Sequence, residues 1–108
     1  MSADPGSLFT DHDWAHAALC RAYPPALADA MWHPDGTRED HTLADRAVTV
    51  CFSCPVRLEC LEVGLDEPWG IWGGSRPNLR ARYRAAQDRL ELVAEASEAS
   101  ARKKGLIP

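Results

Sequence analysis

The sequence has few aromatic residues and no long apolar run. Its 108 residues include two Phe, two Tyr and four Trp, and alanine supplies much of the 45% hydrophobic content. A transmembrane helix needs about 18 or more consecutive apolar residues, and no segment approaches that length. Residues 1–13 are polar and acidic and lack the apolar stretch of a signal peptide. We therefore expect a small cytoplasmic protein with one domain.

Signals for catalysis are also missing. The sequence has no Ser-His-Asp set, no phosphate-binding loop and no pair of acidic residues in apolar surroundings, so general acid–base catalysis is not predicted. The formal net charge of −4 argues against a protein that binds nucleic acid with its whole surface. The sequence therefore predicts a protein that is not an enzyme.

Helical periodicity is present throughout, without any strand pattern, and predicts an all-α fold of four to five short helices. The expected helices span about 13–21, 25–32, 43–51, 55–65 and 77–102. Ser75 is the expected N-cap of the last helix, which carries an apolar stripe of Leu79, Tyr83, Ala86, Leu90 and Val93. We expect a polar loop at 37–41 and a tight turn at 69–74, where three glycines occur in five residues.

Four cysteines form the most informative pattern. Thirty residues separate Cys20 from Cys51, two separate Cys51 from Cys54, and five separate Cys54 from Cys60. A domain this small often depends on a disulfide, a metal or a partner, and a reducing compartment favours metal binding or redox chemistry over a structural disulfide.

Four thiolates suit either a tetrahedral zinc ion or a cubane [4Fe–4S] cluster. Zinc sites usually present two close cysteine pairs, whereas here three cysteines are close and one is remote, which favours the cluster. Zinc, redox-active thiols and buried structural cysteines are the alternatives. A site that uses His16 in place of one cysteine is less favoured, because four cysteines are available.

The sequence resembles the WhiB-like family of actinobacterial iron–sulfur transcription factors. The resemblance rests on Trp14 ahead of Cys20, on the segment CFSCPVRLECL at 51–61, and on GIWGG at 70–74. It implies a helical bundle wrapped around one [4Fe–4S] cluster, with Cys20, Cys51, Cys54 and Cys60 as ligands. It also implies a regulator that responds to redox change or nitric oxide and binds the C-terminal domain of the primary sigma factor within RNA polymerase. The implied domain covers 13–90, between a disordered leader at 1–12 and a helical extension with a short basic tail at 91–108.

The resemblance also indicates which residues contact the partner. In the family, a Phe-Phe pair follows the first cysteine, and here Met31 and Trp32 stand in that region. Trp32 is expected on an exposed apolar surface, with a place in the core as the alternative. Trp72 is expected to contact the partner or to cover the cluster. The predicted partner-binding residues are Trp14, Met31, Trp32, Gly70, Ile71, Trp72, Gly73 and Gly74.

Basic residues follow the glycine-rich turn. Arg76, Arg80 and Arg84 recur every four residues on the predicted last helix, and Arg102, Lys103 and Lys104 lie near its end. Such a row is commonly a solvated face paired with acids. Its position after the turn and the resemblance point to an auxiliary contact with promoter DNA. Two rival functions remain open, a thiol–disulfide reductase that uses cluster-free Cys51 and Cys54 and a structural zinc module that binds protein.

Overall fold

The computed structural model describes residues 13–34 and 38–108, and within these ranges the chain is helical. Two short 3-10 helices, η2 (Asp13–Ala17) and η3 (Leu19–Ala22), precede five α-helices. These are α1 (Pro25–Trp32), α2 (Arg38–Ser53), α3 (Arg57–Gly64), α4 (Pro77–Arg82) and α5 (Arg89–Lys103). The described residues include no strand, only an isolated bridge between Trp72 and Ser75. The predicted all-α class is confirmed.

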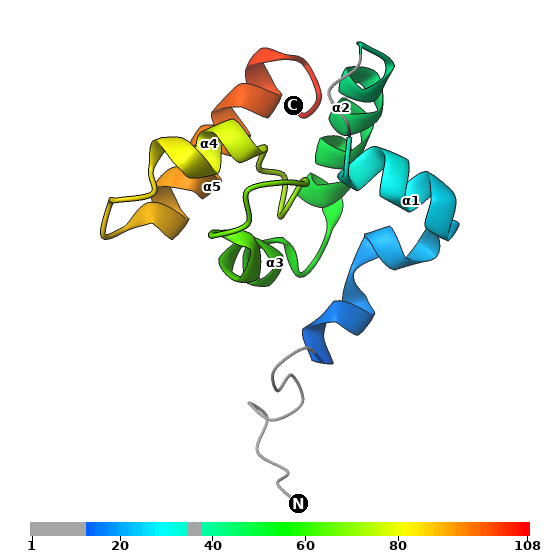
Figure 1. Cartoon of the computed structure of the whole chain (residues 1–108), viewed down its shortest axis with the longest axis horizontal. Helices are drawn as coiled ribbons and strands as arrows, with labels where there is room; N and C mark the ends of the chain where they lie inside the picture. The colour runs from blue at the N-terminus through cyan, green and yellow to red at the C-terminus, as the bar shows by residue number, and fades with distance from the viewer. Residues whose placement is uncertain (1–12, 35–37) are drawn as a thin grey trace, which may run out of the picture.

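The helices lie in two groups on either side of the turn at 69–75. In Figure 1, α1 and α2 lie on one side, α4 and α5 lie on the other, and α3 lies between them with the turn. The chain after α5 returns to α2, where Leu106 and Ile107 pack against the core. No helix in the described part of the chain is long and apolar enough to cross a membrane.

The N-terminal half follows the predictions only in part. The helix expected at 25–32 is confirmed, and it begins with Pro25, whose missing N–H would have no intrahelical partner there. Residues 38–41, predicted as loop, are the first turn of α2, since a polar run is equally compatible with a helix start. Residues 13–21, predicted as one helix, form two 3-10 helices separated at Ala18, which has extended backbone.

The predicted continuous helix at 77–102 is wrong, because α4 ends at Arg82 and α5 starts at Arg89. The apolar stripe is divided between two helices that pack on each other. A periodic pattern cannot distinguish a straight helix from two helices that fold back along the same stripe. Ser75 is not the N-cap either; that position is Arg76, and the Ser75 hydroxyl donates to the Trp72 carbonyl at 2.7 Å.

The main core joins α1, α2 and the turn at 69–75. Alanines on α2 let α1 approach closely, and Ile71 from the turn packs into the same cluster. The buried members are Met31, Trp32, Ala44, Ala47, Val48, Cys51, Ile71 and Ala101. This core places the end of α2, with its cysteines, directly beside the turn.

Candidate metal centre and the adjoining turn

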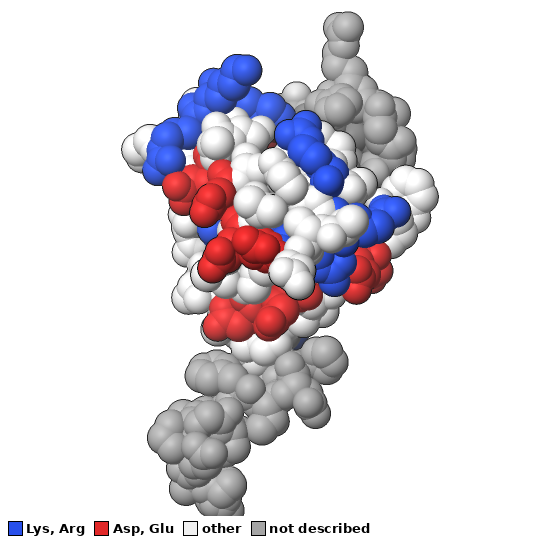
Figure 2. Space-filling view, turned by 90° about the vertical axis from the view of Figure 1, so that its left-hand side faces the viewer, with Lys and Arg blue, Asp and Glu red and all other residues white. Residues whose placement is uncertain are grey.

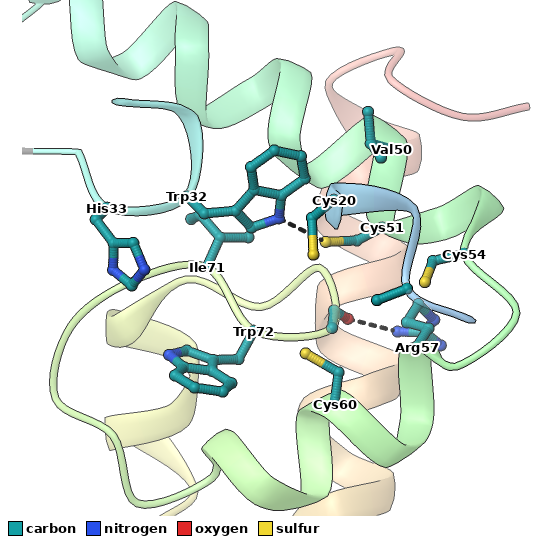
Figure 3. Close-up of a pocket in the computed structure, with 12 residues that line it drawn as sticks. Cys20, Trp32, His33, Val50, Cys51, Cys54, Arg57, Cys60, Ile71 and Trp72 are labelled. Carbon is teal, nitrogen blue, oxygen red and sulfur yellow. Dashed lines mark hydrogen bonds between the residues drawn. The ribbon is translucent and has the colours of Figure 1, made fainter. Parts of the chain in front are cut away.

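All four cysteines line one cavity with a volume of about 190 Å³. Cys20 comes from η3, Cys51 from α2, Cys54 from the connection after α2, and Cys60 from α3. Their thiols face the same space in Figure 3. The structure therefore brings together the four predicted ligands, which are spread over residues 20–60 of the chain.

The chain reversal between α2 and α3 explains how three of these thiols meet. The Cys54 N–H donates to the Cys51 carbonyl at 3.0 Å and ends α2, and the Arg57 N–H donates to the Cys54 carbonyl at 3.3 Å as α3 begins. Pro55 lies in this connection, where its missing N–H breaks the helical pattern. Cys60 lies one turn into α3, on the side that faces back to α2.

The thiols surround the cavity without converging on one point. Within the described ranges, no three Cys, His, Asp or Glu side chains are close enough to bind a single metal ion. A cavity needs a volume of only about 10–15 Å³ to hold one water molecule. The cysteine cavity, with a volume of about 190 Å³, therefore accommodates a group of several atoms. His33 lines the cavity, although the sequence did not single it out, whereas His16 is exposed.

Burial raises the pKa of three of the cysteine thiols and so favours their protonated form. It raises the pKa of Cys60 to about 12, and a hydrogen bond from the Gly73 backbone offsets this only in part. Burial also raises the pKa of Cys51, against the opposing effect of the Trp32 indole, and that of Cys20. A positively charged group in the cavity would reverse this preference and favour the thiolates.

Trp32 connects one candidate ligand to the turn. Its indole Nε1–H donates to Cys51 Sγ at 3.3 Å, and its carbonyl accepts the Ile71 N–H at 2.7 Å. Its exposed fraction is 7%, and that of Met31 is 1%. The prediction that Trp32 lies on an exposed apolar surface is therefore wrong, because both side chains belong to the core.

The turn itself is closely fitted to α3. A Cβ added to Gly73 would lie 2.5 Å from the Arg57 carbonyl oxygen, and the φ of Gly73 is +57°. The Arg57 guanidinium in turn donates to the Gly73 carbonyl at 3.1 Å (Figure 3). Only glycine fits this position without movement of the backbone.

Trp72 lies between the cysteine cavity and α3. It lines the cysteine cavity, and it is half-buried against Gly64 of α3, where an added Cβ would lie 2.3 Å from Trp72 Cγ. Its indole N–H donates to the Trp69 carbonyl at 3.0 Å. Trp69, with an exposed fraction of 77%, was not among the predicted residues, and its position next to a turn glycine was the available signal. Trp14 lies half-buried in η2.

Arg80 is buried beneath the turn, with an exposed fraction of 3%. Its Nε donates to the Glu67 carbonyl at 3.1 Å, and Nη2 donates to the carbonyls of Trp69 at 3.0 Å and Gly70 at 2.8 Å. Nη1 donates to the Ser75 carbonyl at 2.7 Å and to its hydroxyl at 3.0 Å. Burial lowers the pKa of Arg80 to about 10. The predicted DNA contact does not hold for Arg80, since its donors are used inside the protein.

The other predicted DNA-binding residues lie nearer the surface, but not on one helix face. Arg84 follows the end of α4, and Arg76 pairs with Asp45. The remaining residues lie at the C-terminal end of α5. Arg102 pairs with Glu98 at 3.0 Å, Lys104 lies 3.8 Å from Asp45, and Lys103 is exposed. In Figure 2, cations gather along the upper rim of the face shown and most carboxylates lie below them.

Comparison with known proteins identifies relatives for most of the chain. The family described as "Transcription factor WhiB" matches residues 14–83. The chain is 37% identical over 93 residues to the transcriptional regulator WhiD of Streptomyces coelicolor, covering 82% of this chain and 80% of the relative. It is 39% identical to the transcriptional regulator WhiB of the same organism, covering 68% and 77%. It is 36% identical to the redox-responsive transcriptional regulator WhiB3 of Mycolicibacterium smegmatis, covering 65% and 74%. No solved structure matches the chain significantly.

Proposed function

The chain belongs to the WhiB family of transcription factors, and from this premise we propose that it holds one [4Fe–4S] cluster and regulates transcription in response to redox change or nitric oxide. Cys20, Cys51, Cys54 and Cys60 are the proposed ligands. We place the protein in the cytoplasm, with a regulatory rather than an enzymatic role.

One observation carries the choice of cofactor. Four thiols face one cavity, yet no three potential ligands in the described residues are close enough to bind a single ion. A cubane has four irons at separate corners, and each takes one thiolate. This spread of sulfurs supports a cluster over a zinc ion, which would need the four sulfurs around one centre.

The bound cluster would supply the reactivity toward oxygen or nitric oxide that the side chains lack. The chain's own contribution is to bury the thiols, to align Cys51 and Cys60 beside the turn, and to limit the access of water. Trp72 serves this last task from the turn, because it lines the same cavity. Release of the thiols would return them to the protonated form that burial favours and would disturb the attached turn.

The partner that we propose is the C-terminal domain of the primary sigma factor. Trp69 is exposed, and the half-buried Trp72 lines the cavity beside it. Aromatic side chains are frequent hot spots of interfaces. Gly70, Ile71, Gly73 and Gly74 would shape the turn that presents them, while Trp14 would extend the surface. Met31 and Trp32 would support it from the core.

Promoter DNA is the second proposed partner, through weak contacts made together with the sigma domain. Phosphate contacts by a few cations add affinity but read little sequence. The candidates are Arg76, Arg84, Arg102, Lys103 and Lys104. Arg76 and Arg102 would first have to leave their carboxylate partners.

Metal analysis tests the proposal. The protein is purified without oxygen after co-expression with the sigma domain, and iron, sulfide and zinc are measured per chain. We expect about four irons and four sulfides, with the sigma domain in the same chromatographic peak. Cys54→Ala should lose both the iron and the partner, whereas Ser53→Ala, one residue away and exposed, should retain both.

The other outcomes separate the rival functions. Zinc without sulfide would indicate a structural module. Reduction of insulin disulfides by the iron-free protein, abolished by Cys51→Ser, would indicate a thiol–disulfide reductase. The burial of Cys51, whose exposed fraction is 7%, weighs against the reductase, because a cycling thiol must reach its substrate.

A further inference from the structure

The indole of Trp32 makes a contact that its packing role does not require. Its N–H donates to Cys51 Sγ at 3.3 Å, in the interior, between residues nineteen positions apart. An indole can only donate a hydrogen bond, and a buried indole N–H usually finds a partner. Here the partner is the sulfur of a proposed cluster ligand, where a carbonyl would have satisfied the N–H equally well.

Two contacts hold Trp32 in place. Its backbone carbonyl accepts the Ile71 N–H at 2.7 Å. The Tyr23 ring packs against it with centroids 5.4 Å apart and an interplanar angle of 65°. The edge that carries Nε1 faces the cysteine cavity in Figure 3. A donor fixed in this way does not need to reorganise when the sulfur gains negative charge, and such charge-assisted hydrogen bonds are stronger than neutral ones.

We propose that Trp32 tunes the cluster through Cys51, by donating a hydrogen bond that withdraws electron density from this ligand sulfur and raises the reduction potential of the cluster. The inference rests on the proposed function, since it requires a cluster at the four cysteines. Hydrogen bonds to the sulfurs are among the main determinants of the reduction potentials of iron–sulfur clusters. More generally, groups that hydrogen-bond to a metal ligand alter the properties of the metal site. A phenylalanine at this position would fill space without donating.

The proposed rise in reduction potential has a consequence for sensing. A higher potential makes the cluster harder to oxidise, so Trp32 would slow its loss in air. Because the Trp32 carbonyl also receives the Ile71 N–H, the residue that tunes the cluster is the one that connects it to the turn. Changes at the sulfur therefore have a direct route to the surface proposed to bind the partner.

The test removes the donor while keeping the ring. In one protein Trp32 is replaced by benzothienylalanine, which has the shape of tryptophan with sulfur in place of the N–H, and in a second by phenylalanine, Trp32→Phe. Tyr23→Leu is the matched control, because it loosens the packing of the same indole and leaves its N–H intact. All proteins are purified without oxygen, and each is characterised by redox titration and by the half-life of its visible absorbance in air.

We expect both donor-free proteins to titrate at a more negative potential than the wild type and to lose their absorbance several-fold faster. Tyr23→Leu keeps the N–H donor, so its potential should lie closer to that of the wild type than the potential of either donor-free protein, even if its half-life falls. An unchanged potential in the benzothienylalanine protein would overturn the proposal. So would a more positive potential, because it would mean that the change admits water, whose own hydrogen bonds reach the sulfurs. Wild-type protein without iron would overturn the proposed function itself, whereas iron-loaded protein with an unchanged potential would overturn only the tuning.

Discussion

The buried side chain of Arg80 lies on one side of the turn at 69–75, and the cysteine thiols lie on the other. The two sides differ in whether the protein itself supplies their polar partners. Arg80 donates five hydrogen bonds to oxygens of the surrounding chain. On the other side, burial raises the pKa of three thiols that share a cavity of about 190 Å³. The arginine side is therefore complete without a ligand, whereas on the cysteine side the charged thiolates would form only beside a positively charged bound group.

The difference suggests that the two sides of the turn depend on different things. Arg80 fixes the carbonyls of Glu67, Trp69, Gly70 and Ser75, so one edge of the turn is held by protein alone. The edge that carries Ile71 and Trp72 faces the cavity, and under the proposed function it would depend on the bound cluster. A sensor benefits from this division, since loss of the bound group would alter the cavity edge without unfolding the whole turn.

Iron removal should give the largest effect and tests the division directly. A structural metal site contributes on the order of 10 kcal/mol to folding, and here that contribution should be concentrated on the cysteine side. Hydrogen exchange of the protein before and after chelation should show a large loss of protection in η3, α1 and the start of α3. Protection in α5 should fall much less. An equal loss in α5 would mean that the two sides form one cooperative unit.

Substitution of Arg80 should have the next largest effect. Arg80→Met removes five hydrogen bonds and leaves buried carbonyls without donors, so we expect a loss of about 3 kcal/mol or more in the free energy of unfolding. Arg82→Met, on the same short helix but exposed, should change it by less than about 0.5 kcal/mol. Urea unfolding under nitrogen, followed by circular dichroism, measures both. Similar values for the two variants would refute a buried role for Arg80.

Alanine substitutions at two glycines with positive φ distinguish the cost of a steric clash from the cost of backbone strain. The φ of Gly73 is +57° and that of Gly105 is +77°, but an added Cβ meets the Arg57 carbonyl oxygen at 2.5 Å only at Gly73, and nothing within 4 Å at Gly105. Gly105→Ala should cost about 1–2 kcal/mol from strain alone. Gly73→Ala should cost about 2–5 kcal/mol, because overpacking adds to the strain. Equal losses in urea unfolding would mean that the turn can move away from α3.

Local patterns in the sequence predicted the elements that local physics decides. The helix at 25–32, the tight turn at 70–74 and the meeting of Cys51, Cys54 and Cys60 all depend on residues close together in the chain. Proline, glycine and cysteine spacing carry such information directly. The prediction that Cys20 joins this group came from chemistry, because a site of this kind takes four thiolates. In the structure Cys20 lines the same cavity as the other three cysteines.

The features that the sequence did not predict depend on tertiary packing. The apolar stripe from Leu79 to Val93 is present, but only the packing of α4 on α5 shows that it belongs to two helices. Arg80 looked like one member of a basic row, because its burial depends on carbonyls contributed by Glu67, Trp69 and Gly70. Trp32 was expected at the surface because nothing in its local sequence reveals that Ile71 and Cys51 surround it.

The smallest effect expected concerns an ion pair at the solvent-exposed edge of the arginine side. Arg89 Nη1 lies 2.7 Å from Asp66 Oδ1, and the Asp66 side chain has an exposed fraction of 80%. The hydrogen bond from Arg89, together with its charge, lowers the pKa of Asp66. The stabilisation is therefore present above the unfolded pKa of about 3.9 and is lost as the pH falls through the lower, folded value.

Asp66→Asn should accordingly lower the thermal midpoint slightly at pH 7, and the difference from wild type should vanish at about pH 2 or in high salt. The iron-free protein is used, so that acid does not change the metal content. Glu62→Gln, an exposed change on α3, is the control. A difference that persists in acid would trace the effect to something other than this ion pair. A difference as large as that of Arg80→Met would erase the contrast between buried and exposed arginines on this side of the turn.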